Sequence, residues 1–206
     1  GDGRTPALNT EPVVRALAYL RALVADGVLE PEAEYAAMNS DFLSGEAALV
    51  FNGDWALPDY ALAERLGESG LGIAPLPRVS DTGLPLVPWS SPSMLLLPLG
   101  VSGARYRAAA DFIGFVTSPE QQLRLAQDHN AIPARVGVLE TDPAVPVQRS
   151  VLARAARVAV PQPSRPEMDA VLAAVRTHLP GVLRGEIAPE EGARRMQETA
   201  QQLIGQ

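Results

Sequence analysis

The strongest candidate for binding chemistry is Asn52-Gly53-Asp54-Trp55, which holds one of only two tryptophans in the chain. A flat indole face offers a large apolar contact to the polarised C–H groups of a sugar ring, and a glycine in the turn lets the backbone approach closely. The Asp54 carboxylate is able to bind paired hydroxyl groups. Two interpretations stay open for each residue: Trp55 is a binding platform or a core residue, and Asn52 and Asp54 are ligands or ordinary turn residues.

The second tryptophan, Trp89, lies between two prolines in the sequence Val-Pro-Trp-Ser-Ser-Pro, where a core position is less natural. We predict a loop over 78–92, rich in Pro, Gly and Ser. Within it, Trp89 and the hydroxyl of Ser91 are candidates for a second ligand-binding surface.

Catalytic and metal-binding patterns are weak by comparison. His129 and His178 are far apart and match no metal-ligand spacing. Gly100–Gly103 lacks the spacing of a nucleophile elbow, and the acidic pair Glu190-Glu191 is explained by a helix start. We predict no catalytic residue, no metal site and no cofactor. A carbohydrate-active enzyme that pairs Asp54 with a second acid stays as an alternative.

Composition limits the class of protein. The 206 residues are enough to bury a core, 47% of them are hydrophobic, and the mean hydropathy is +0.03. The net charge of −7 argues against nucleic-acid binding. All 17 basic residues are Arg, which indicates a biased genome and weakens the functional weight of any single Arg.

The chain has no Cys, so neither a disulfide nor a thiolate site is possible. No run approaches the roughly 18 apolar residues of a membrane span. The start at Gly1 lacks the features of a signal peptide, so an exported protein is expected to be present here as a mature piece.

Hydrophobic periodicity and turn residues predict alternating helices and short strands, and hence an α/β fold. Helices are expected over 12–25, 57–66 and 104–116, after Ser118 to Gln121, after Pro166 and from Pro189, because apolar residues recur there at helical spacing. In the helix over 104–116, the residues expected to be buried are Ala108, Phe112 and Phe115. In the helix from Pro189, the apolar stripe is Ala193, Met196, Ala200 and Leu203. Strands are expected over 47–51, which is predicted to be buried, over 72–77, and over 93–99, which is predicted to be covered on both faces.

The segment Phe42–Ala56, with the pattern FxxGxAAxxxNGxW, resembles a segment of the extracellular solute-binding proteins of ABC importers, of the maltose-binding type (family 1). The elements that follow Ala56 in the chain also resemble those of the family, in the same order. A Pro-containing strand and loop follow, then the helix pair AADFIGFVTSPEQQ, the turn at Ile132-Pro133 and two closing helices. It covers residues 6–204.

The resemblance implies a periplasmic-binding-protein-like fold of type II, present as its C-terminal half because the family is about twice as long. It assigns 1–86 and 161–206 to the C-terminal lobe and 87–160 to a crossover segment that belongs to the N-terminal lobe. The first half would be absent, which leaves apolar surface exposed and allows association into a dimer.

In function, the resemblance implies an extracytoplasmic protein that captures maltose or a related oligosaccharide by hinged closure of two lobes and docks on the membrane permease. Trp55 would stack on a sugar ring, while Asp54, Asn52 and Arg176 would bind hydroxyls and Trp89 with Ser91 would close one side. The family has aromatic residues where this chain has Leu172 and Ala173, which favours a smaller or different solute. The main alternative is a non-catalytic domain that binds another protein.

Overall fold

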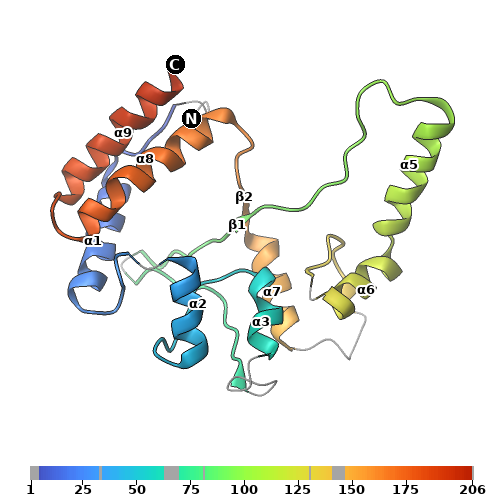
Figure 1. The fold of residues 1–206 in the computed structure, drawn as a ribbon, viewed down its shortest axis with the longest axis horizontal. Helices are drawn as coiled ribbons and strands as arrows, with labels where there is room; N and C mark the ends of the chain where they lie inside the picture. Colours follow the sequence, from blue (N-terminus) through green and yellow to red (C-terminus); the bar gives the residue numbers. More distant parts are fainter. Residues whose placement is uncertain are drawn as a thin grey trace. The chain divides into compact units, whose positions relative to one another are not determined.

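The computed structural model describes residues 5–32, 34–62, 70–80, 82–129, 131–140 and 147–205 (Figure 1). The chain divides into two compact units. The first consists of Gly1–Met38 and Pro163–Gln206, and the second is Asn39–Gln162. The assignment of residue ranges to the two lobes stays a prediction.

Three helices form the first unit: α1 (Glu11–Ala25), α8 (Pro166–Leu183) and α9 (Pro189–Ile204), which lie side by side in Figure 1. Each begins with Pro at an early position, where the missing N–H costs nothing. Gly27 follows α1 with a positive φ of 69°, which a glycine adopts without strain. These are the helices that the sequence predicts, and all three predictions are confirmed.

The core of this unit is a buried cluster of Leu17 from α1, Val182 from α8, and Ala193 and Met196 from α9. Side chains that are partly buried pack around it: Leu8, Val13, Val14, Val175, Leu179 and Ile187. Of the stripe predicted on α9, Ala193, Met196 and Ala200 are buried, but Leu203 is 41% exposed because it lies in the last turn of the helix.

Small residues allow α8 and α9 to approach closely. A Cβ on Gly192 would overlap the Cγ2 atom of Val182, which is fully buried, and a Cβ on Gly181 would lie 2.8 Å from Ile187 Cδ1. The segment before α1 is tied to α9 by Gln197, whose Oε1 accepts from Leu8 N at 2.7 Å and whose Nε2 donates to Pro6 O at 2.9 Å.

The second unit contains short helices and one pair of strands. Its described elements are α2 (Tyr35–Ser44, which crosses the boundary between the units), η1 (Asp54–Ala56), α3 (Leu57–Leu62), β1 (Trp89–Ser90), α5 (Gly103–Val116), α6 (Pro119–His129), η2 (Val138–Glu140), α7 (Val147–Val158) and β2 (Val160–Pro161). β1 and β2 are parallel, with Trp89 opposite Val160 and Ser90 opposite Pro161.

The three strands predicted over 47–51, 72–77 and 93–99 are not formed. Leu49 and Phe51 are 86% and 69% exposed, so the expected burial of the first segment is also wrong. A strand needs a neighbour for its backbone N–H and C=O groups. Within the described ranges, the only pairings are β1 with β2 and an isolated bridge between Arg78 and Pro85, and neither provides that neighbour.

Helices α5 and α6 form where they are predicted, but the apolar face of α5 is not covered. Phe112 and Phe115 are each 58% exposed, and Ala108 is exposed too, which contradicts the predicted burial. At the start of α6, Gln121 N donates to Ser118 Oγ at 3.4 Å, as an N-cap requires. Buried Gln122 then links α6 to its surroundings: it donates to Val116 O at 3.0 Å and accepts from Ala134 N at 2.8 Å.

Another prediction falls partly outside the described residues. The helix predicted over 57–66 is seen as α3 (Leu57–Leu62), and its remainder lies outside the described residues. None of the helices in the described ranges is both long enough and apolar enough to cross a membrane.

The close contact at Gly192 predicts that Gly192→Ala destabilises the first unit. Overpacking a core typically costs about 1–3 kcal/mol, which exceeds the gain in helix propensity of about 1 kcal/mol. The matched control is Gly114→Ala in α5, where an added Cβ meets nothing within 4 Å. Urea unfolding followed by circular dichroism should show a lower midpoint for the first variant and an unchanged or higher one for the second. Equal midpoints would contradict the packing described here.

The ion pairs on α9 predict a dependence of stability on pH. Arg194 and Arg195 lower the pKa of Glu191 from its usual 4.5 to about 2 by hydrogen bonds and charge. Because the folded pKa is the lower one, this stabilisation is present above pH 4.5 and is lost as the pH falls towards 2. Glu191→Gln should therefore flatten the decline in thermal stability over that interval, whereas Glu190→Gln, on the exposed neighbouring residue, should leave it unchanged.

Candidate functional site

The turn at Asn52–Ala56 is held in place by two helices. Ala56 and Tyr60 are buried, and Phe42 and Leu43 from α2 pack against them together with Val50 and Leu71. The rings of Phe42 and Tyr60 lie 5.0 Å apart at a tilt of 59°, a favourable aromatic geometry. The turn is therefore held in place by apolar contacts with α2 and α3.

Polar contacts fix the first residue of the turn. Asn52 Nδ2 donates to Asn39 Oδ1 at 3.0 Å and to the Tyr60 hydroxyl at 2.8 Å, and that hydroxyl donates a short hydrogen bond to Asn39 Oδ1. Asn52 Oδ1 accepts from Gly53 N at 2.9 Å. Both amide hydrogens of Asn52 are thus used within the protein. Its geometry is that of a residue that positions the turn, and its predicted contact with a ligand stays a prediction.

Gly53 is required by the side chain two residues later. Its φ of −99° and ψ of 175° are extended values that any residue adopts, so chirality does not demand glycine here. However, a Cβ at this position would overlap the six-membered ring of Trp55. Absence of a side chain therefore lets the indole lie directly against the backbone of the turn.

Trp55 itself is presented to the outside. It follows Asp54 in η1, and its side chain is 70% exposed, while the adjacent Ala56 is 3% exposed and anchors the helix. The structure thus settles one alternative left open by the sequence: Trp55 is not a core residue of this unit. The six-membered ring of the indole packs on Gly53, and most of the side chain is exposed.

Asp54 lies beside this platform at the first position of η1 and is partly exposed. Its backbone carbonyl accepts from Leu57 N, while its carboxylate forms no hydrogen bond to any residue in the described part of the chain. A carboxylate next to an exposed indole is suited to accept hydrogen bonds from hydroxyl groups on a stacked ring.

Trp89 and Ser91 lie elsewhere in the same unit. The predicted loop over 78–92 is wrong at its end, because Trp89 and Ser90 form strand β1. Val160 N donates to Pro88 O and Gln162 N to Ser90 O, both at 3.0 Å, so the tryptophan backbone is held by β2. Trp89 is 55% exposed and Ser91 is also exposed. Both are accessible, and their approach to Trp55 stays a prediction.

Arg176 belongs to the first unit, on α8. It is exposed, and its Nε donates to Leu172 O at 3.4 Å, one turn earlier on the same helix. Because it lies in a different unit from the two tryptophans, its inclusion in a common site stays a prediction.

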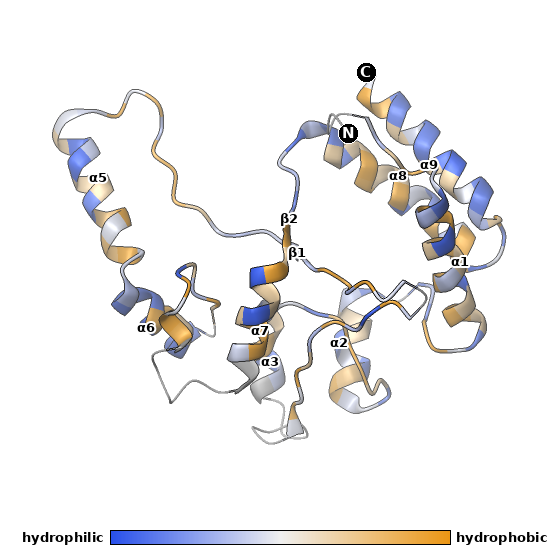
Figure 2. Cartoon of the chain, turned by 180° about the vertical axis from the view of Figure 1, so that it is seen from behind, coloured by the Kyte–Doolittle hydropathy of each residue, from blue (hydrophilic) through white to orange (hydrophobic). Residues whose placement is uncertain are grey.

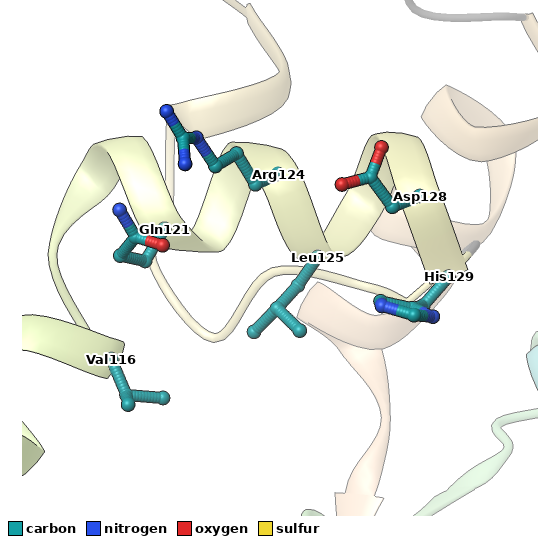
Figure 3. A pocket seen from close by; sticks show the side chains of 6 residues that line it. All are labelled: Val116, Gln121, Arg124, Leu125, Asp128 and His129. Carbon is teal, nitrogen blue, oxygen red and sulfur yellow. The ribbon is translucent and has the colours of Figure 1, made fainter.

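A hollow of about 320 Å³ lies beside α6, lined by Val116, Gln121, Arg124, Leu125, Asp128 and His129 (Figure 3). Five of these six residues come from α6 at the spacing of one helix face. Arg124 forms an exposed ion pair with Glu120 at 3.2 Å. The hollow therefore lies along one face of α6, and the sixth residue, Val116 at the end of α5, lines it at one end.

Two residues that matter to the turn were missed at the sequence level. Asn39 and Tyr60 hold Asn52, yet neither stands out as a candidate in the sequence. The available signal is their spacing: Tyr60 lies one helical turn after Ala56, and Asn39 lies one turn before Phe42. Polar groups on otherwise apolar helix faces commonly satisfy one another when buried.

The chain is similar in sequence to known proteins. A family model described as bacterial extracellular solute-binding protein matches residues 2–154. Among curated proteins, the chain is similar to the maltotriose-binding protein of Pyrococcus abyssi (strain GE5 / Orsay), with 28% identity over 161 residues. The match covers 76% of this chain and 34% of that protein.

Among solved structures, the chain is similar to the maltose/maltodextrin-binding domain from Bdellovibrio bacteriovorus bound to maltotriose, with 30% identity and a TM-score of 0.77. It is also similar in fold to the maltose-binding periplasmic protein from Listeria monocytogenes in complex with maltose, with 18% identity and a TM-score of 0.79. In both cases the match covers 100% of this chain and 54% of the other. The chain thus spans about half the length of these proteins, and the predicted periplasmic-binding-protein-like α/β fold class is confirmed.

The packing of the Trp55 ring on Gly53 predicts a spectroscopic effect. In a Trp89→Phe background, where Trp55 is the only tryptophan, Gly53→Ala should displace the ring from the turn. Its emission should shift to longer wavelength, and acrylamide should quench it more strongly. Gly72→Ala is the matched control, because a Cβ there meets nothing within 4 Å. An identical spectrum for both variants would contradict the described contact.

Proposed function

Because the chain belongs to the family of bacterial extracellular solute-binding proteins, we propose that it carries one wall of the solute site of an ABC importer's binding protein. The proposed solute is a short oligosaccharide of the maltose type. Support comes from the sugars named for its relatives. One relative is a maltotriose-binding protein, and two similar structures were solved with maltotriose or maltose bound. The family is one of solute-binding proteins, so a binding role is favoured over a catalytic one.

The observation that carries the proposal is the presentation of Trp55. An indole that is 70% exposed, packed on a glycine and placed beside a carboxylate, provides both elements of sugar recognition. The ring face covers the apolar side of a pyranose, and Asp54 accepts hydrogen bonds from its hydroxyls. The hydrogen-bonded Asn39–Asn52–Tyr60 group keeps the platform in place before the ligand arrives, which lowers the entropic cost of binding.

In this proposal the site is completed by polypeptide that corresponds to the other half of the relatives. The chain spans 54% of the solved structures, so a ligand on Trp55 would meet only part of its site. A ligand that bridges two lobes stabilises the closed arrangement by its higher affinity for it. Trp89, Ser91 and Arg176 would contact the solute in that closed state. The closed protein would then dock on the importer's membrane subunits, outside the cytoplasm.

The aliphatic residues Leu172 and Ala173 on α8 indicate the size of the solute in this proposal. Leu172 and Ala173 on α8 offer no aromatic face, so stacking surfaces are few. We expect a disaccharide or trisaccharide to bind better than long maltodextrins, because further sugar rings would find no additional platform.

The test is a fluorescence titration with maltose and maltotriose, and with lactose as a control for hydroxyl geometry. It is made on the chain alone and on the chain mixed with the first half of the Bdellovibrio domain. We expect a saturable change for maltose or maltotriose in the mixture only. Trp55→Ala should weaken binding at least tenfold, which corresponds to about 1.4 kcal/mol.

The matched control is Tyr19→Ala, an aromatic residue of the first unit that is 65% exposed. It should leave the affinity unchanged. Equal losses from Trp55→Ala and Tyr19→Ala, or a flat response to every sugar in the mixture, would contradict the proposal.

A further inference from the structure

Asn52 and Gly53 form the one Asn-Gly pair of the chain, and this pair is chemically labile. The other asparagines, Asn9, Asn39 and Asn130, are followed by Thr, Ser and Ala. Because glycine has no Cβ, it leaves its own main-chain nitrogen unshielded. Such a nitrogen can attack the side-chain amide carbon of a preceding asparagine and convert it into an acid without an enzyme. The pair is therefore a candidate site of covalent modification.

The structure places the two reacting groups side by side. The turn lies at the end of the segment that joins α2 to α3 (Figure 2). Asn52 Oδ1 accepts a hydrogen bond from Gly53 N at 2.9 Å, so the Cγ atom that carries this oxygen lies beside the same nitrogen. Both residues are half-buried, which leaves the turn accessible to water.

The reaction needs only the chain and water. Gly53 N forms a bond to Asn52 Cγ, the bond from Cγ to Nδ2 breaks, and the hydrogen of the attacking nitrogen leaves with Nδ2 as ammonia. The product is a five-membered succinimide ring. Water then opens this ring at one of its two carbonyl carbons, which gives aspartate at one and isoaspartate at the other.

Two side chains hold the amide away from this reaction. The nitrogen must approach Cγ from above the plane of the amide, whereas here its N–H points at Oδ1. Rotation of the amide would break the bonds from Asn52 Nδ2 to Asn39 Oδ1 at 3.0 Å and to the Tyr60 hydroxyl at 2.8 Å. Tyr60 is itself buried against Phe42, so this restraint rests on a packed base. The reaction therefore requires local opening of the turn.

Either product would disturb the turn. Aspartate lacks both amide hydrogens, and its carboxylate would face Asn39 Oδ1, which is also an acceptor. Isoaspartate adds one carbon to the main chain and moves Gly53 relative to the helices. The ring of Trp55 lies against Gly53, where a Cβ would overlap it, so this contact depends on the position of that backbone.

We propose that Asn52–Gly53 is a site of spontaneous deamidation, that Asn39 and Tyr60 hold it in an unreactive orientation, and that the modification releases Trp55 from the turn. The lifetime of the exposed indole platform is then set by two residues that do not belong to it.

The experiment uses the whole chain in the Trp89→Phe background, where Trp55 is the only tryptophan. The chain is kept in warm, mildly alkaline buffer and analysed over time by peptide mapping, with electron-transfer fragmentation to distinguish aspartate from isoaspartate. We expect conversion at Asn52 before any at Asn9, which is exposed but followed by Thr10. In the converted chain, the emission of Trp55 should move to longer wavelength and acrylamide should quench it more strongly.

Variants test the restraint. Tyr60→Phe keeps the ring against Phe42 and removes the hydroxyl that accepts from Asn52. Conversion should become about fivefold faster, which corresponds to about 1 kcal/mol, the typical contribution of one hydrogen bond. Asn39→Ala removes the other acceptor and should also accelerate it. The matched control is Tyr106→Phe on α5, where the tyrosine is 50% exposed, and the rate should stay unchanged.

Three results would overturn the inference: equal conversion rates in Tyr60→Phe and Tyr106→Phe, an intact Asn52 when Asn9 is already converted, or an unchanged emission of Trp55 after conversion. No sugar enters this experiment. The deamidation site and the proposed carbohydrate site therefore fail separately, since a flat sugar titration leaves the conversion rates unaffected.

Discussion

The dependence of a β-strand on its neighbours is the constraint that shapes this chain. A helix pairs its own backbone groups, but a strand pairs only when another strand lies alongside it. Within the described residues, β1 and β2 pair with each other over two residues, whereas the segments 47–51 and 93–99 pair with no strand. Apolar residues such as Leu49 and Leu96 are exposed as a consequence.

The same constraint explains why the two units differ. The first unit needs only helices, and α1, α8 and α9 bury Leu17, Val182 and Met196 among themselves. The close approach of α8 and α9 depends on Gly192, which leaves room for Val182. In the described part of the second unit, the buried apolar residues are Ala56 and Tyr60 with the side chains around them, and Ala126, Val138 and Val151, while the phenylalanine face of α5 is left uncovered.

The binding turn is an exception inside the second unit, because it does not depend on a sheet. Side-chain hydrogen bonds among Asn39, Asn52 and Tyr60 take the place of a strand ladder and fix the turn on α2 and α3. Trp55 then projects outward from a rigid base. Preorganised platforms of this kind bind with a smaller entropic loss than flexible ones, and this one is held by side chains although the segment before it forms no strand.

The sequence by itself determined the helices α1, α3, α5, α6, α8 and α9, the family, and the turn with its tryptophan, because each of these depends on residues close together in the chain. It did not predict helix α7. It was wrong about the strands at 47–51, 72–77 and 93–99 and about the buried face of α5. Only the tertiary structure decided that Trp55 is exposed, that Gly53 makes room for its ring, and that Asn39 and Tyr60 hold Asn52. Burial and pairing depend on what lies alongside a segment in space, and local patterns specify a segment's own preference but not its neighbours.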